Sequence, residues 1–271
     1  MASSPHVLSL FDLTGRVFLV VGGARTLGRD MASALAEAGA DGMITSRTEE
    51  ASQKTAAELA QATGRKIVGQ GLDAIDESQI KAAVDACVNI FGRIDILINN
   101  VGGGAARPGV SSKIEERQMQ DWLALQQANV TGPYFVCKHV IPVMRKQKSG
   151  SIINIASIAG IIGRDRRVYV DGMGAQSIDY AAAKAAIIGM TRDLAAYVGD
   201  DGIRVNAISP GGFKRGQPQG FIDRYSDKTI LKRMGTDGVD LKGAAVYLAS
   251  NASAYVTGHN LVVDGGFIVW Q

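Results

Sequence analysis

The sequence has no hydrophobic run that approaches the ~20 residues of a transmembrane helix. Its opening stretch, MASSPHVLSL, also lacks the charged region and the long apolar core of a secretory signal peptide. We therefore expect a cytoplasmic protein that has no membrane partner.

Cysteine is scarce, because the chain of 271 residues contains only 2. Cys87 and Cys137 both lie among apolar residues of helix-like segments. This setting favours two buried, reduced thiols over a disulfide or a redox pair. The cysteines thus indicate a reducing compartment.

Neither sign of charge dominates: 29 lysine and arginine residues oppose 26 aspartate and glutamate residues, for a formal net charge of +3. The basic residues are scattered and form no stripe of the kind that nucleic-acid binding needs, so we expect no nucleic-acid partner. The small positive excess suits a phosphate-bearing ligand.

The chain also lacks internal repeats, linkers and low-complexity tracts. A hydrophobic content of 46% is enough for a full core, so we expect a single domain over residues 1–271.

Short β-branched runs alternate with alanine-rich helical segments along the whole chain. Strands are predicted at 16–22, 42–46, 66–73, 94–100, 150–157, 203–209 and 260–266. Helices are predicted at 26–40, 49–64, 77–92, 123–144 and 179–198. This alternation predicts an α/β fold with a doubly wound parallel sheet, a Rossmann fold, buried by helices on both faces. Residues 211–235 are rich in glycine, proline and charge, which predicts an irregular, mobile loop over a site.

A glycine-rich stretch, VGGARTLGRD, joins the first predicted strand to the first predicted helix. In that position the N–H groups and the dipole of the helix point at the turn, where a pyrophosphate fits. Gly22 permits a tight turn and Gly28 a close contact, while Thr26 offers a hydroxyl where a glycine is expected. An ordinary glycine turn between strand and helix is the alternative interpretation.

The end of the second predicted strand bears on which nicotinamide cofactor binds. NAD sites place an acidic residue there, whereas this chain has Ser46 followed by Arg47. No carboxylate repels a 2′-phosphate at this point, and the guanidinium of Arg47, with Arg25 from the glycine turn, can bind one. We therefore expect NADP(H) to be preferred, with NAD(H) possible. Two solvated arginines are the alternative.

Tyr180 and Lys184 are four residues apart in a segment of strong helix propensity, so both side chains project from one face. A phenol has an ordinary pKa of about 10, and a nearby ammonium favours its phenolate form. The pair can therefore act in acid and base chemistry, although such pairs are also common on helix surfaces.

Further features accompany the pair in a fixed order: the turn at Gly22, Asp73 in GLDAIDE, NNVG at 99–102, Asn129, Ser157 after a strand, and SPGG at 209–212. With these residues the sequence resembles the short-chain dehydrogenase/reductase family from Leu13 to the closing LVVDGG.

The resemblance implies a role for each catalytic position. Tyr180 would protonate the carbonyl oxygen during reduction and act as the base in the reverse direction. Lys184 would lower the pKa of Tyr180 and hold the nicotinamide ribose, Ser157 would bind the substrate oxygen, and Asn129 would anchor a water of a proton relay. Hydride moves directly between nicotinamide and substrate, so no metal is expected.

The resemblance also implies a set of cofactor contacts along the crevice. They are Gly22, Arg25, Thr26, Leu27, Gly28, Ser46, Arg47, Asp73, Asn100, Val101, Gly102, Tyr180, Lys184, Pro210 and Gly211.

The sequence departs from the family pattern T-G-x-x-x-G-x-G, because Val21 and Thr26 stand at its first and sixth positions. These departures affect the expected cofactor pose. Val101 replaces the alanine of N-N-A-G, which is a mild enlargement. The stretch from Ser157 to Tyr180 is longer than usual, which predicts an insertion at 160–178 on the substrate side.

The insertion carries Arg164, Arg166 and Arg167, and the later loop carries Lys214 and Arg215. Four of these cations are candidate substrate residues: Arg164, Arg167, Lys214 and Arg215. Around one pocket mouth they would suit a carboxylate or a polyhydroxylated acid. The chain looks most like family members that act on sugars, aldonates and keto-uronates.

Three alternatives to this reading stay open. The four cations can be solvated loop charges, and the same catalytic set serves 3-oxoacyl thioesters and simple ketones. A protein of another class, a non-catalytic NADP-binding sensor, is the third.

We expect a homo-oligomer, most plausibly a tetramer.

Overall fold

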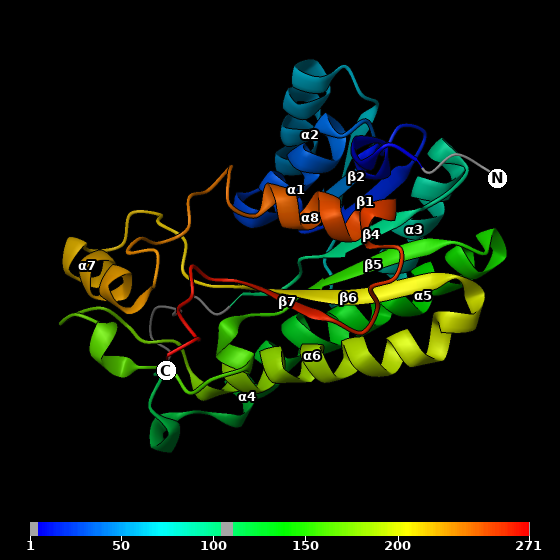
Figure 1. Ribbon diagram of the computed structural model, residues 1–271. Coiled ribbons are helices and arrows are strands. Elements are labelled where there is room, and N and C mark those ends of the chain that lie inside the picture. The colour runs from blue at the N-terminus through cyan, green and yellow to red at the C-terminus, as the bar shows by residue number, and fades with distance from the viewer. Residues whose placement is uncertain (1–4, 104–110, 271) are drawn as a thin grey trace.

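The computed structural model describes residues 5–103 and 111–270, and its centre is one seven-stranded sheet (Figure 1). The strand order is β3-β2-β1-β4-β5-β6-β7, and every neighbouring pair is parallel. The strands are β1 (Val17–Val21), β2 (Asp41–Ser46), β3 (Ile67–Gly71), β4 (Ile96–Asn99), β5 (Gly150–Ile155), β6 (Ile203–Pro210) and β7 (Asn260–Val263). The predicted doubly wound parallel sheet is confirmed.

Helices lie on both faces of the sheet. They are α1 (Thr26–Glu37), α2 (Glu49–Thr63), α3 (Glu77–Phe91), α4 (Met119–Gln126), α5 (Gly132–Gln147), α6 (Ile178–Val198), α7 (Gln219–Lys228) and α8 (Lys242–Ala249). None of the helices in the described residues is both long and apolar enough to cross a membrane.

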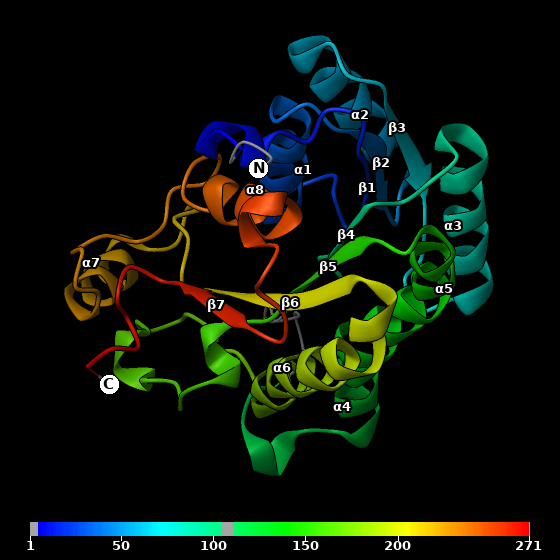
Figure 2. The same cartoon turned by 45° about the vertical axis from the view of Figure 1, so that its right-hand side comes forward.

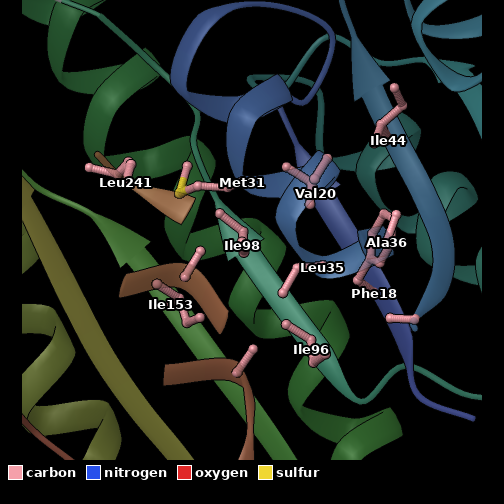
Figure 3. Close-up of a cluster of buried hydrophobic side chains, with 14 of the residues drawn as sticks. Phe18, Val20, Met31, Leu35, Ala36, Ile44, Ile96, Ile98, Ile153 and Leu241 are labelled. Atoms are coloured by element: carbon pink, nitrogen blue, oxygen red, sulfur yellow. The ribbon is translucent and has the colours of Figure 1, made fainter. Parts of the chain in front are cut away.

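Two apolar cores follow from the alternation of side chains along the strands. On one face Phe18 and Val20 of β1 pack with α1, α2 and α8, as Figure 3 shows. On the other face Val17, Leu19 and Val21 pack with α3, α5 and α6. Every residue of β1 is buried, as expected for a strand covered on both sides.

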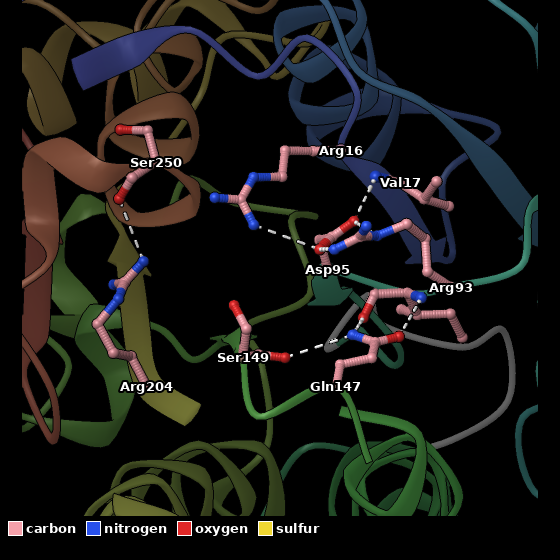
Figure 4. Close-up of polar contacts among 9 residues, drawn as sticks. Arg16, Val17, Arg93, Asp95, Gln147, Ser149, Arg204 and Ser250 are labelled. Carbon is pink, nitrogen blue, oxygen red and sulfur yellow. Dashed lines mark hydrogen bonds and ion pairs between the residues drawn. The ribbon is translucent and has the colours of Figure 1, made fainter. Parts of the chain in front are cut away.

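The amino ends of the strands carry a structural ion cluster. Asp95, which precedes β4 and is 3% exposed, accepts a hydrogen bond from Val17 N at 2.9 Å and pairs with Arg93 at 2.7 Å (Figure 4). Arg16 lies 3.4 Å from the same carboxylate. Because the contacts of Val17 and Arg16 with Asp95 join the ends of β1 and β4, this edge of the sheet is tied together and leaves the carboxyl edge for ligands.

The single helix predicted at 123–144 is wrong, because the structure divides it. Between α4 and α5 the chain makes a wider, π-helical turn at Gln127–Thr131. Pro133 has no N–H with which to continue the ladder of an α-helix, so the hydrogen-bonding pattern must change before it.

The prediction that 211–235 holds no regular element is also wrong. Its centre is helix α7, where Phe221, Ile222 and Tyr225 share one apolar face. That face packs with Val168 from the predicted insertion and with Phe267 near the C-terminus. Figures 1 and 2 show α7 and the C-terminus side by side, away from the main sheet.

The two cysteines are free and buried, as predicted. Burial raises the pKa of Cys87 and of Cys137 to about 12, so both thiols stay protonated near neutral pH.

Candidate active site

A cavity of about 670 Å³ lies at the carboxyl ends of β1, β4, β5 and β6. Between β1 and β4 the strand order reverses, which is where open α/β sheets bind their ligands. The cavity is lined by these predicted site residues: Thr26, Leu27, Asn100, Val101, Gly102, Ser157, Arg164, Tyr180, Lys184, Pro210, Gly211 and Arg215. Other predicted cofactor contacts lie outside the cavity, at and just beyond the ends of β1, β2 and β3. They are Gly22, Arg25, Gly28, Ser46, Arg47 and Asp73.

The glycine turn after β1 is closed by a side chain from β4's end. Asn100 Nδ2 donates a hydrogen bond to Gly22 O at 2.9 Å. Gly22 has a φ of +79°, and a Cβ on Gly28 would lie 2.0 Å from Gly22 O. Only glycine fits at both positions, so the turn and the start of α1 are in direct backbone contact.

The first turn of α1 is suited to a phosphate. Its N-cap residue, Arg25, makes no side-chain hydrogen bond to the helix, which leaves the first N–H groups uncapped by any side chain. Thr26 has a φ of +46°, in the left-handed region that favours glycine. The residues present therefore fit a dinucleotide, with a threonine in a backbone conformation for which the family pattern uses glycine.

The adjacent strand end brings two arginines close to this turn. Gly23 N donates to Thr45 O at 2.9 Å, which joins the turn to the end of β2. Arg25 and Arg47 are exposed, and neither has an ion pair within residues 5–103 and 111–270. Ser46 Oγ donates to Thr48 O at 2.6 Å. Two free guanidinium groups thus lie where the sequence predicts a 2′-phosphate.

Asp73 lies two residues beyond β3 and is partly exposed. Its Oδ1 accepts a hydrogen bond from Ile75 N at 3.2 Å, and its own N–H donates to Gln79 Oε1 at 3.0 Å. The carboxylate is therefore oriented by its own turn.

Ser157 follows β5 at the start of a short helical turn, Ile158–Gly160, where its Oγ accepts from Ala159 N at 3.2 Å. A Cβ on Gly160 would lie 2.6 Å from Ala185 N. The absent side chain lets this turn contact the backbone of α6. Gly160 is a functional position that sequence reasoning missed, and its only signal was a small residue three positions after the serine.

Tyr180 and Lys184 project from the first turns of α6. Lys184 is 4% exposed, and its Nζ donates to Ile155 O, the last residue of β5, at 2.8 Å. The same Nζ lies 5.7 Å from the centre of the Tyr180 ring. Burial lowers the pKa of Lys184 to about 8. The lysine thus ties α6 to the sheet beside the tyrosine.

The acidity of Tyr180 is set by other neighbours than expected. Burial raises its pKa, and the effects that lower it are a hydrogen bond with Ser157 and the charge of Arg164. Lys184, the residue expected to lower this pKa, is not among the groups that shift it here.

Asn129 lies in the π-helical turn and is 1% exposed. Its Oδ1 accepts from Gly103 N at 3.1 Å, and its Nδ2 donates to Leu125 O at 3.1 Å. It does not line the cavity. In the structure its amide holds the segment after β4 and binds a carbonyl group of α4.

The start of α6 is fixed by a buried ion pair that no sequence pattern predicts. Asp179, next to Tyr180, is fully buried, and its carboxylate accepts from Arg117 Nε at 3.0 Å. The partners are 62 residues apart, and no local pattern connects them.

Two of the four predicted substrate cations line the cavity, Arg164 and Arg215, and two do not. Arg167 pairs with Asp165 at 2.8 Å with its side chain 83% exposed, and Lys214 is exposed. Arg215 pairs with Asp237 at 2.5 Å. Of the two arginines that line the cavity, Arg215 has a carboxylate partner, and Arg164 has none within the described residues.

An aromatic wall of four side chains forms another part of the cavity lining. Tyr225 stacks on Phe267 with ring centres 4.4 Å apart, and Phe221 lies 5.8 Å from Tyr225 and 5.5 Å from Tyr169. All four residues line the cavity. Sequence reasoning missed this wall, although the C-terminal stretch GGFIVWQ is apolar. Phe267 packs within its own chain.

Comparisons with known proteins agree with this geometry. Residues 22–268 match the family described as Enoyl-(Acyl carrier protein) reductase. The chain is 36% identical to 2-dehydro-3-deoxy-D-gluconate 5-dehydrogenase of Dickeya dadantii, with 97% of this chain and 99% of the relative covered. It is 34% identical to 3-oxoacyl-(acyl-carrier-protein) reductase of Chlamydia muridarum, with 94% and 98% covered.

Among solved structures, a gluconate 5-dehydrogenase from Burkholderia cenocepacia in complex with NADP and tartrate is similar, with a TM-score of 0.86 and 32% identity. The match covers 97% of this chain and 99% of that one. Sequence and structure thus agree over nearly the whole length, and the chain belongs to the short-chain dehydrogenase/reductase family of oxidoreductases, which interconvert C=O and CH–OH groups.

Proposed function

We propose that this oxidoreductase uses NADP(H) and acts on the carbonyl or secondary alcohol of a small acid, such as a sugar acid, aldonate or keto-uronate. The observation that carries the proposal is one cavity. It joins Thr26 and Leu27 of the first turn of α1, together with Ser157, Tyr180 and Lys184, to an arginine that has no carboxylate partner among the described residues. We place the whole activity in a single domain, residues 1–271, with substrate-side segments at 160–178 and 211–235.

The chain's own residues supply the acid chemistry. When bound, the nicotinamide supplies or accepts the hydride. The Tyr180 hydroxyl donates its proton to the carbonyl oxygen in reduction and takes it back in oxidation, while the Ser157 hydroxyl donates a hydrogen bond to the same oxygen. Lys184, fixed by Ile155 O, holds the ribose, and Asn129 keeps the segment after β4 in place.

The preference for NADP(H) rests on Arg25 and Arg47 beside Ser46, and the NADP bound to the Burkholderia relative supports it. Arg47→Ala is expected to weaken NADPH binding about tenfold or more and to leave NADH binding unchanged, because a charged hydrogen bond contributes about 1.5–3 kcal/mol. Fluorescence titration of both cofactors measures this. Arg29→Ala removes a nearby arginine that pairs with Glu58 and is the matched control. An equal loss of both cofactors would contradict the assignment.

The substrate class rests on the charge of Arg164 in the cavity, and the sugar-acid dehydrogenases among the relatives support it. A second candidate is a 3-oxoacyl thioester or a simple ketone, which the aromatic wall and the Chlamydia relative favour. Oxidation of NADPH across keto-aldonates, keto-uronates, ketoses, 3-oxoacyl thioesters and simple ketones separates the two. Turnover confined to uncharged or acyl substrates would overturn the first.

We also propose a homotetramer located in the cytoplasm. Apolar side chains of Met119, Trp122 and Leu123 on α4 and of Ile178 on α6 are exposed on one chain, which favours burial between chains. The free thiols favour a reducing compartment. Light scattering of the purified protein tests the tetramer, and a monomer would contradict it.

A further inference from the structure

Arg164 differs from the other charged groups of the cavity, because one nitrogen of its guanidinium is buried and has no hydrogen-bond partner among the described residues. Its Nη1 donates to Gln176 O at 2.5 Å, which fixes the side chain across the base of segment 160–178. Its Nη2 is buried and has no hydrogen-bond partner in the described part of the chain. Burial of a charged donor without an acceptor costs free energy. A ligand that brings an acceptor to this nitrogen would therefore be stabilised there.

The neighbouring carboxylate, that of Asp165, does not pair with Arg164, because it already forms ion pairs with other residues. Asp165 is bound by Arg167 at 2.8 Å and by Lys228 of α7 at 2.9 Å. These contacts occupy Asp165, whose side chain is 8% exposed and which also lines the cavity. The result is a segment in which Arg167 is neutralised and Arg164 keeps its charge in the cavity.

Helix α7 also holds the segment from outside. Arg224 Nη1 donates to Tyr169 O at 2.9 Å and to Arg167 O at 3.3 Å. Val168 is buried in the apolar cluster that α7 and Phe267 form. Arg164 is therefore carried on an anchored backbone, as a specific recognition group must be.

We propose that Arg164 binds a carboxylate of the substrate, and that this binding holds Tyr180 in its protonated form, the form that donates the proton during reduction. The proposal deepens the proposed function, since it names the group that recognises the acid and couples substrate charge to catalysis.

The coupling follows from the charges around Tyr180. Arg164 lowers the pKa of this phenol, as does the hydrogen bond with Ser157, while burial and Tyr169 raise it. A bound carboxylate neutralises Arg164 and removes its stabilisation of the phenolate. The pKa of Tyr180, already above its ordinary value, then rises further, and the phenol stays protonated over a wider range of pH. The proton later moves to the substrate oxygen.

The other charged groups near the cavity do not supply this effect. The ammonium of Lys184 donates to Ile155 O, Arg215 is paired with Asp237, and Asp165 is occupied as described. An anion that enters the cavity thus meets Arg164 as its one unpaired guanidinium among the residues the structure describes.

The test measures the titration of Tyr180 directly, by NMR of the protein labelled with ¹³C at the phenol carbon of tyrosine. The chain has 7 tyrosines, and Tyr180→Phe assigns the signal. Gluconate and hexanoate are the probes, one hydroxylated and one apolar, with sorbitol and hexanol as their uncharged counterparts. We expect either acid to raise the pKa of Tyr180 by about one unit and the alcohols to leave it unchanged.

Arg164→Gln is expected to start from a higher pKa of Tyr180 and to abolish the response to acid. Arg166→Gln is the matched control: it removes the same charge from the same segment, but its side chain is exposed and outside the cavity. Arg164→Lys keeps the charge and is expected to keep part of the response. Thermal unfolding of each variant confirms that it is folded.

Kinetics provide the second measurement. Arg164→Gln is expected to raise the KM of acidic substrates about tenfold to a hundredfold, and to leave the KM of uncharged ketones within about twofold. In the unaltered protein, the pH profile of kcat with an acid is expected to show a higher pKa than that of kcat/KM, since the two report bound and free enzyme.

The outcomes separate this inference from the proposed function. A response to acid that persists in Arg164→Gln, or a protein whose Tyr180 responds to neither acid, would overturn the inference. Lack of NADPH oxidation with every substrate would overturn the proposed function alone, because the titration of Tyr180 needs no turnover.

Discussion

The backbone of Gly160 lies directly against the backbone of Lys184: a Cβ on Gly160 would be 2.6 Å from the carbonyl carbon of Lys184. Gly160 ends the turn that carries Ser157, and Lys184 belongs to the helix that carries Tyr180. The distance between Ser157 and Tyr180 therefore depends on the absence of one methyl group.

Gly160→Ala is expected to lower kcat at least tenfold, because the turn must move away from α6 and take Ser157 with it. Forcing a side chain into such a contact also destabilises a protein by about 1–3 kcal/mol. Gly163→Ala is the control, since no atom lies within 4 Å of a Cβ there. Steady-state kinetics and chemical denaturation of both variants test the prediction, and equal effects of the two would contradict it.

Tyr180→Phe is expected to lower kcat by about 10²–10⁴-fold, the contribution of a positioned general acid. The ring and its packing remain, so binding of NADPH, followed by its fluorescence, is expected to stay within about twofold. A variant with a near-normal rate would show that another group donates the proton.

The stability of the protein is expected to rise with pH through the titration of Lys184. Burial lowers its pKa from 10.5 to about 8, so between these values the unfolded chain binds a proton that the folded chain does not. Stability then increases by up to about 1.4 kcal/mol per pH unit. The free-energy penalty of the buried ammonium is fully present below pH 8 and is lost progressively as the pH rises from about 8 to 10.5.

Lys184→Met removes this titration and measures it by difference. Relative to the variant, the unaltered protein is expected to gain stability as the pH rises from about 8 to 10. Urea unfolding of both proteins at a series of pH values provides the comparison. A difference that does not change with pH would mean that the lysine is not buried in its charged form.

Thr26→Gly is expected to leave the stability unchanged or to raise it by up to about 1 kcal/mol. A left-handed conformation costs a residue with a side chain about 1–2 kcal/mol, which exceeds the entropic cost of glycine in the unfolded chain, about 0.5–1 kcal/mol. Thr26 has this conformation, with a φ of +46°.

Thr48→Gly is the control for this change, since Thr48 has a φ of −105° and makes no side-chain cap. Glycine at that position is expected to destabilise slightly, because no strain is relieved there. Chemical denaturation of the two variants gives the comparison, and a loss at Thr26 greater than that at Thr48 would show that the threonine hydroxyl stabilises the turn.

Much of the fold could be predicted because its signals are local. Each strand of the sheet is a short apolar run, and each covering helix has its own periodicity, so the alternation alone predicts a parallel sheet. Of the two errors, the first has a local cause and the second a contact between segments distant along the chain. The helix predicted across Asn129 is divided at Pro133, and α7 forms because Phe221 and Tyr225 find an apolar partner in Val168.

The sequence by itself determined the glycine turn, the tyrosine and lysine on one face of a helix, and the order in which these features occur, because each depends on spacing within a few residues. Only the tertiary structure decided which charges enter the cavity. Arg164 and Arg167 are three residues apart and chemically identical, yet Asp165 binds Arg167 and leaves Arg164 with a buried, unpartnered nitrogen. Pairing of this kind depends on contacts such as Lys228 with Asp165, 63 positions away along the chain, and no local spacing encodes them.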